Sequence, residues 1–128
     1  MISIDKEIWK LLKDVPRITT IKIFFYIATN QPEEGIRGYK TSKTQLMRDI
    51  NSGRTNFFRD LKWLKENMLI QELKVDKKSD FMVNPHYVTN DYDGQARIDE
   101  WIRRCNLDIQ REARLFKKRL QQTLIQPF

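Results

Sequence analysis

Residues 54–62 contain side-chain types that can read the edges of DNA bases. Arginine offers two donors that match the acceptors of guanine, asparagine pairs similarly with adenine, and threonine combines a hydroxyl with a methyl group that suits thymine. A helix that buries Phe57, Leu61 and Leu64 would present the opposite, polar face to such a ligand. The alternative is a face that is polar only for solubility. We predict base contacts from Arg54, Thr55, Asn56, Arg59 and Lys62.

Phe58 is the apolar exception on this predicted face. Its ring either meets a thymine methyl group or packs under the amino-terminal helix. We favour packing.

A second group of residues has the character of a phosphate-binding site. A helix N-terminus attracts phosphate because its first amides are unpaired and carry partial positive charge. Ser42 and Thr44 stand at the start of a predicted helix, and nearby lysines add positive charge. For the two lysines at the tip of a predicted hairpin, a DNA contact and a solvated turn are equally compatible with the sequence. The predicted phosphate contacts are Lys40, Ser42, Lys43, Thr44, Lys77 and Lys78.

Residues suited to catalysis or metal binding are scarce. His86 is the one histidine and Cys105 the one cysteine, so the sequence has neither a paired-histidine metal site nor a zinc framework. We interpret His86 as a packed or surface imidazole and Cys105 as a small apolar residue at a helix interface. We expect no enzymatic activity, no metal and no cofactor.

Two predicted helices position the polar face. Ser42 can cap a helix over residues 43–50, with Gln45 reaching back to complete a capping box. A tight turn at residues 51–53 follows, and Ser52 can cap a second helix over residues 54–67. Two helices joined by so short a connection predict a helix-turn-helix.

The flanking segments complete the predicted domain. Residues 3–15 have helical periodicity with Ser3 as a possible cap, and Pro16 ends that helix. Residues 21–28 are apolar nearly all round and predict a buried helix, although a buried strand has the same pattern. Residues 69–75 and 81–84 predict two strands of a hairpin, joined by the polar residues 76–80. Pro85 has no amide hydrogen and should end the second strand or lie on its free edge.

This order of elements resembles a winged helix-turn-helix DNA-binding domain. The spacing Phe57-x-Arg59-x-Leu61-x-x-Leu64 followed by Leu69-Ile70 is similar to a recognition helix leading into a wing. Residues 80–88, Asp-Phe-Met-Val-Asn-Pro-His-Tyr-Val, resemble the segment that closes the wing in plasmid replication initiators of the RepL type, and residues 21–30 resemble that family's first buried helix. The resemblance spans residues 18–90. It implies a replication role. The sequence departs from the pattern at Asn67-Met68, where a glycine is common, and in its long basic carboxyl-terminal helix.

Residues 95–123 predict one long helix with an apolar stripe. Its apolar residues recur every eleven positions, which keeps the stripe nearly straight. Such a helix either lies across its own domain or pairs with a second copy, and we favour a homodimer. The basic residues Arg111, Arg114, Lys117, Lys118 and Arg119 either contact phosphate or serve solubility, which we favour. The predicted dimer interface is Ile98, Ile102, Cys105, Ile109, Ala113, Phe116, Leu120 and Leu124.

Composition and charge set the limits of these predictions. The 128 residues, 40% of them hydrophobic, suffice for a folded core, and the net charge of +7 favours an acidic partner. The excess is concentrated in residues 36–70, with eight basic and three acidic side chains, and in residues 95–128, with eight and four. No apolar run is long enough to span a bilayer and no secretory signal is recognisable, so we expect a cytoplasmic protein.

The predicted architecture is therefore mainly α with a small β-hairpin: a winged-helix DNA-binding domain over residues 1–94, followed by a long helix over residues 95–128. We expect a sequence-specific binder of double-stranded DNA at an inverted or direct repeat, in plasmid or phage replication or maintenance. A transcriptional repressor has the same surface and differs in the machinery that it recruits. A winged-helix module for protein assembly is the alternative of another class.

Overall fold

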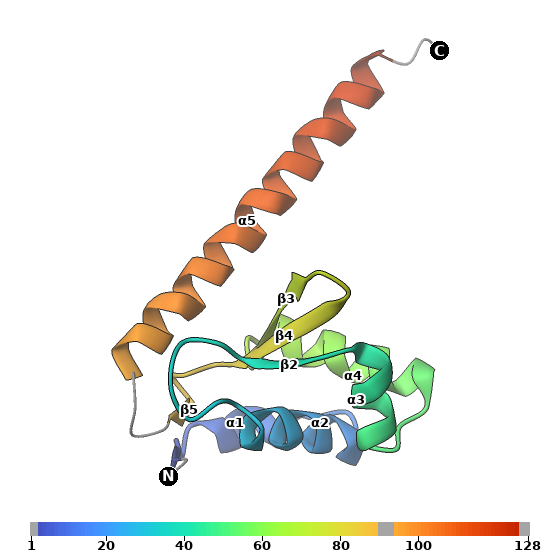
Figure 1. The fold of residues 1–128 in the computed structure, drawn as a ribbon. Coiled ribbons are helices and arrows are strands. Elements are labelled where there is room, and N and C mark those ends of the chain that lie inside the picture. The colour runs from blue at the N-terminus through green and yellow to red at the C-terminus, as the bar shows by residue number, and fades with distance from the viewer. Residues whose placement is uncertain (1–2, 90–93, 126–128) are drawn as a thin grey trace.

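The computed structural model describes residues 3–89 and 94–125, with side chains up to Gln121. Short helices and small sheets form one compact part, from which a single long helix extends (Figure 1). The helices are α1 (Ile8–Leu12), α2 (Ile18–Thr29), α3 (Lys43–Asp49), α4 (Arg54–Glu66) and α5 (Gly94–Ile125). The strands are β1 (Ser3–Ile4), β2 (Tyr39–Thr41), β3 (Ile70–Val75), β4 (Lys78–Val83) and β5 (Val88–Thr89). The chain is mainly helical with a small antiparallel sheet, as the sequence predicts.

Helix α2 supplies several of the core residues. Apolar residues occupy nearly every side of this helix, and Ile23, Phe24 and Ile27 have no exposed surface. The predicted buried helix is therefore confirmed. Helix α4 packs against α2 with the predicted stripe, so that Phe57 and Leu64 have no exposed surface. Helix α3, the sheet and the residue before β3 complete the core with Leu46, Leu69, Ile70, Phe81 and Val83.

The predicted hairpin is part of a larger sheet. Strands β3 and β4 pair antiparallel, and β2 adds on the other side of β4 to give the order β2-β4-β3. The connection is shorter than predicted: Val75 is paired with Lys78, so only Asp76 and Lys77 turn the chain. Polar residues at 78–80 suggested a loop, but they form the start of β4 because internal hydrogen bonds satisfy Ser79 and Asp80.

The amino terminus differs from the prediction. Ser3 does not cap a helix, because Ser3 and Ile4 pair with β5 in a separate two-stranded sheet. The amide of Asp5 donates to the carbonyl of Tyr87, which extends this contact and delays the helix until Ile8. Neither β1, β2 nor β5 has enough residues for a recognisable strand pattern.

Helices α3 and α4 end in the same C-terminal motif. The amide of Ser52 donates to Met47 and that of Leu69 to Leu64, the long hydrogen bonds of a Schellman motif. The motif requires a left-handed residue after the helix, and Asn51 and Met68 adopt φ of 53° and 58°. Met68 thus occupies the position where glycine is common.

The predicted caps are correct only in part. The Ser42 hydroxyl accepts the amide of Gln45 at 3.0 Å, as expected. The Gln45 side chain, however, donates to Asp49 instead of returning to the start of the helix, so the capping box is incomplete. At α4 the cap is Gly53, and the Ser52 hydroxyl donates to the carbonyl of Gly53 and does not cap the helix.

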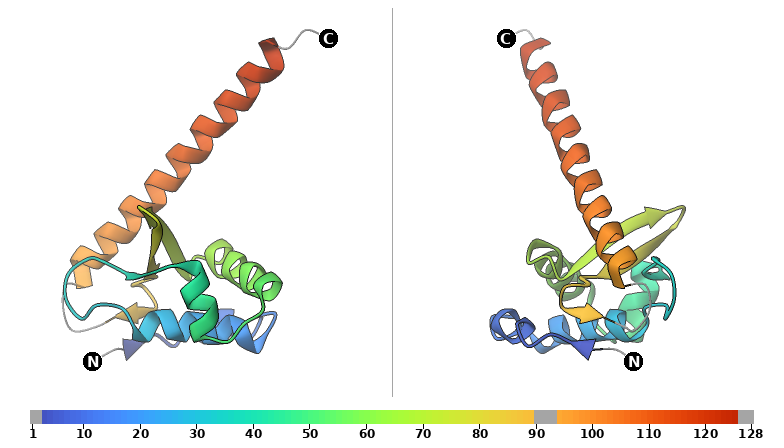
Figure 2. Two further views of the ribbon diagram at one scale, coloured as in Figure 1. Left: turned by 45° about the vertical axis from the view of Figure 1, so that its right-hand side comes forward. Right: turned by 90° about the vertical axis from the view of Figure 1, so that its left-hand side faces the viewer.

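Helix α5 has two different parts. Near its start, Arg97, Glu100, Trp101 and Arg104 are buried against the rest of the chain. Every side chain from Asn106 to Gln121 is exposed, and the helix extends away from the other elements in each view (Figure 2). Among the helices described, none is both long and apolar enough to cross a membrane.

Candidate nucleic-acid interface

The outer side of α4 brings together the five residues predicted to read bases. Arg54, Thr55, Asn56, Arg59 and Lys62 are all exposed, whereas Phe57, Leu61 and Leu64 of the same helix are buried. The Lys62 ammonium lies 3.8 Å from the Glu66 carboxylate, one turn further along the helix. The face therefore offers guanidinium, amide and hydroxyl groups from successive turns of one helix.

A buried carboxylate fixes this helix in place. Asp60 has no exposed surface, yet it lies between the exposed Arg59 and the core residue Leu61. It accepts the Thr19 hydroxyl at 2.7 Å and the Thr20 hydroxyl at 2.9 Å, and pairs with the Arg17 guanidinium at 2.7 Å. The donors come from the start of α2 and the residue before it, so the network locks α4 to α2. The sequence gives one signal of it, since position 60 falls on the inward stripe three residues after Phe57.

Phe58 stays at the surface, contrary to the favoured expectation that it packs under the amino-terminal helix. Its side chain is 38% exposed, and the ring meets Phe57 edge to face at 5.4 Å between centroids. Lys43 and Arg54 place their charges 5.8 and 5.7 Å from the ring centroid, within reach of cation–π attraction. Phe58 therefore joins α3 to α4 at the edge of the polar face and positions Arg54.

Most predicted phosphate contacts line one groove between the start of α3 and the hairpin. Ser42, Lys43 and Thr44 lie on one side of it, and Lys77 and Lys78 on the other. Lys40 is exposed on β2 and does not line the groove. The remaining lining residues are Lys74, Asp76 and Ser79, none of which was predicted to contact phosphate.

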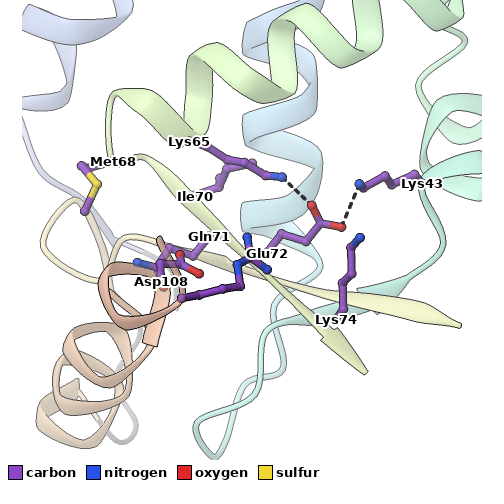
Figure 3. A pocket seen from close by; sticks show the side chains of 9 residues that line it. Lys43, Lys65, Met68, Ile70, Gln71, Glu72, Lys74 and Asp108 are labelled. Carbon is purple, nitrogen blue, oxygen red and sulfur yellow. Dashed lines mark hydrogen bonds and ion pairs between the residues drawn. The ribbon is translucent and has the colours of Figure 1, made fainter. Parts of the chain in front are cut away.

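Glu72 lines a neighbouring pocket, where it holds Lys43 of this groove and Lys65 of α4 (Figure 3). Its carboxylate is hydrogen-bonded by Lys65 and by the Ser79 hydroxyl, and the Lys43 ammonium lies 3.3 Å away. Burial opposes ionisation of Glu72, but these contacts outweigh it and lower the pKa of the carboxyl. Lys43 is therefore partly neutralised by an internal partner. Sequence reasoning missed Glu72 because a charged residue in a short strand is ordinarily exposed.

A second ionic network attaches α5 to the sheet. Arg104 in α5 donates to Asp80 in β4 at 2.9 Å and to Glu100 at 3.0 Å, with all three side chains buried. Hydrogen bonds from Arg103, followed by those from Arg104, lower the pKa of Glu100 despite its burial. Asp80 also accepts the amide of Gly38 at 2.9 Å. A Cβ at position 38 would overlap the Phe81 carbonyl and the Asp80 carboxylate, so this approach requires glycine.

The predicted dimer residues divide along α5. Ile98 and Cys105 are half-buried near the compact part, and Gln71 donates a hydrogen bond to the Cys105 sulfur. Burial raises the pKa of the Cys105 thiol. The exposed members are Ile102, Ile109, Ala113, Phe116 and Leu120, whereas the Leu124 side chain lies outside the described residues.

His86 belongs to no cluster of potential metal ligands in the part of the chain that the structure describes. No group of three potential metal-binding side chains occurs within residues 3–89 and 94–121. The His86 side chain is exposed, and its Nδ1 lies 3.0 Å from the Asn84 side-chain oxygen.

No protein-family model matches the sequence, and none of the curated proteins matches it significantly.

Proposed function

We propose that this protein binds double-stranded DNA in a sequence-specific manner through a winged helix-turn-helix. The element order α2-β2-α3-α4-β3-β4 and the sheet order β2-β4-β3 support this proposal. In this interpretation α4 is the recognition helix and the β3–β4 hairpin is the wing.

The observation that carries the proposal is the adjacency of two different surfaces. The outer face of α4 has groups suited to base edges, and the groove beside α3 has lysines suited to phosphate. Lys43 lies at the boundary of the two surfaces, since it lines the groove and also places its ammonium group over the Phe58 ring of α4. A duplex that placed its major groove over α4 would bring a backbone strand toward Lys74, Lys77 and Lys78.

We further propose that the protein acts as a homodimer in the cytoplasm, in plasmid or phage replication or maintenance. A transcriptional repressor would use the same DNA-reading face and recruit different machinery. The exposed apolar residues of α5 also fit a protein-assembly module, which would need no DNA contact.

A salt titration separates DNA binding from assembly. Duplexes selected from a random pool are titrated by fluorescence anisotropy at several salt concentrations. We expect the logarithm of the association constant to fall linearly with the logarithm of salt, by a slope of about 0.9 for each phosphate contact. Absence of duplex binding at low salt would overturn the proposal.

Replacement of single side chains then separates base reading from phosphate contact. Arg59→Ala should cost about 1–3 kcal/mol on the preferred duplex and relax its base preference, because a bidentate base contact is lost. Lys77→Ala should weaken binding to all duplexes alike and reduce the salt slope by about 1. Arg114→Ala on the exposed part of α5 is the matched control and should leave base preference unchanged.

A further inference from the structure

The outer part of α5 has an apolar seam that the compact part of the chain does not cover. The buried residues Arg97, Glu100, Trp101 and Arg104 recur at intervals of three, one and three, and define the side that packs on the domain. A different side carries Ile109 and Phe116, whose side chains are 65% and 61% exposed. One helix thus has two faces, one occupied by its own domain and one facing solvent.

Over residues 102–120 the solvent-facing seam follows a heptad, because the exposed Asn106 takes the place of Cys105, the half-buried member of the eleven-residue pattern. Its members are separated by four, three, four, three and four residues, the alternation that keeps a seam facing a partner helix in a coiled coil. Ile98 and Cys105, which interrupt this alternation, are half-buried near the compact part and fall outside the seam. The seam consists of Ile102, Asn106, Ile109, Ala113, Phe116 and Leu120, and all six side chains are exposed.

The residues beside the seam distinguish one pairing direction from the other. Glu112 directly precedes Ala113 of the seam, and Lys117 directly follows Phe116 on the opposite flank. In a parallel two-stranded coiled coil these flanks face each other with an offset of five residues, so Glu112 meets Lys117 of the second copy. In an antiparallel pair each flank instead faces the equivalent flank of the second copy, so Lys117 faces the flank that carries Arg103.

Asn106 gives a second indication of the same arrangement. It is the one polar member of the seam, and the heptad assigns it to the same position as Ala113 and Leu120. An asparagine there pairs with its own counterpart across a parallel dimer, which fixes register and favours two strands.

We propose that residues 102–120 of two copies pair as a parallel two-stranded coiled coil. The occupant of the exposed seam is therefore a second copy of this chain. A parallel two-fold dimer holds both domains at the same end of the coiled coil. The preferred DNA would therefore be an inverted repeat, and this one consequence rests on the proposed function.

Disulfide cross-linking tests the direction of pairing without DNA. Leu120→Cys is made in a Cys105→Ser background, so that position 120 carries the only thiol, and is oxidised at a concentration where the wild type is dimeric. We expect a disulfide-linked dimer, because equivalent seam positions face each other in a parallel pair. A monomeric wild-type chain at tens of micromolar would overturn the proposal. So would failure of this variant to cross-link while a mixture with Ile102→Cys in the same background does.

A charge exchange tests the register. Glu112→Lys and Lys117→Glu should each raise the dimer dissociation constant by about 3- to 10-fold in sedimentation equilibrium, since each leaves two like-charge contacts. The double variant E112K/K117E should restore the wild-type value. Lys118→Glu on the outer side, with the same charge change as Lys117→Glu, is the control and should leave the constant within about 2-fold. Equal effects of K117E and K118E, or no restoration in the double variant, would contradict the register.

These measurements stay separate from the DNA proposal. Cross-linked dimers that bind no duplex would leave the pairing intact and overturn the proposed function. Duplex binding by a chain that is monomeric, or that cross-links only in the mixture with Ile102→Cys, would leave the DNA proposal intact and overturn the parallel pairing.

Discussion

Helices α4 and α5 are both long, amphipathic and basic, yet only α4 has its apolar side covered. Phe57, Leu61 and Leu64 of α4 are buried by α2 and the sheet. Ile109, Phe116 and Leu120 of α5 have similar helical spacing and are exposed. An apolar stripe thus shows that a helix needs a partner, and the rest of the fold decides whether that partner is internal.

Matched phenylalanines provide the strongest test of this comparison. Phe57→Ala should lower the free energy of unfolding by about 3–5 kcal/mol, because it empties a fully buried site. Phe116→Ala should change it by less than about 0.5 kcal/mol at concentrations where the chain is monomeric. Urea denaturation followed by tryptophan fluorescence measures both values. A loss of several kcal/mol from F116A in the monomer would mean that the outer part of α5 packs on its own domain.

Acid titration compares the buried ion pairs with the exposed ones. The pKa of Glu72 is lowered in the folded protein, so folding favours the ionised carboxylate. The contribution of Glu72 to the free energy of unfolding is present above pH 4.5, the ordinary pKa of this carboxyl. It disappears as the pH falls through the lower pKa of the folded state.

Glu72→Gln should therefore cost about 1–3 kcal/mol near neutral pH, and its stability should converge with that of the wild type in acid. Urea midpoints between pH 3 and 7 test this expectation. Glu66→Gln is the control, because Glu66 forms an exposed pair with Lys62 and should change stability by less than about 0.5 kcal/mol. A difference between E72Q and wild type that did not vary with pH would contradict the assigned role of Glu72.

The C-terminal ends of α3 and α4 provide the finest comparison. Met68→Gly should stabilise the fold by about 0.5–1 kcal/mol, because glycine adopts φ of 58° without strain. Asn51→Gly should gain less, since asparagine tolerates the left-handed region. Thermal unfolding of the two variants, measured in parallel, tests the order. A larger gain at position 51 would contradict this account of the turns.

The sequence predicted the elements that have long, regular patterns. The stripe on α4, the buried α2 and the extent of α5 all follow from hydrophobic spacing, and the polar face of α4 follows with them. The short strands were not predicted, because two or three residues show no periodicity and their pairing partners lie far away along the chain. The burial of Glu72 and Asp80 was not predicted for a different reason. It depends on Lys65 and Arg104, and only the tertiary structure brings those partners near.

The attachment of α5 through Arg104 and Asp80 has a mechanical consequence. From Arg104 to Ile125 the helix continues without interruption over about 30 Å, at about 1.5 Å for each residue. A tilt of about 5° at the attachment therefore moves the far end by about 3 Å. Because α5 is long and stiff, a few side chains at its base determine the position of residues several turns away.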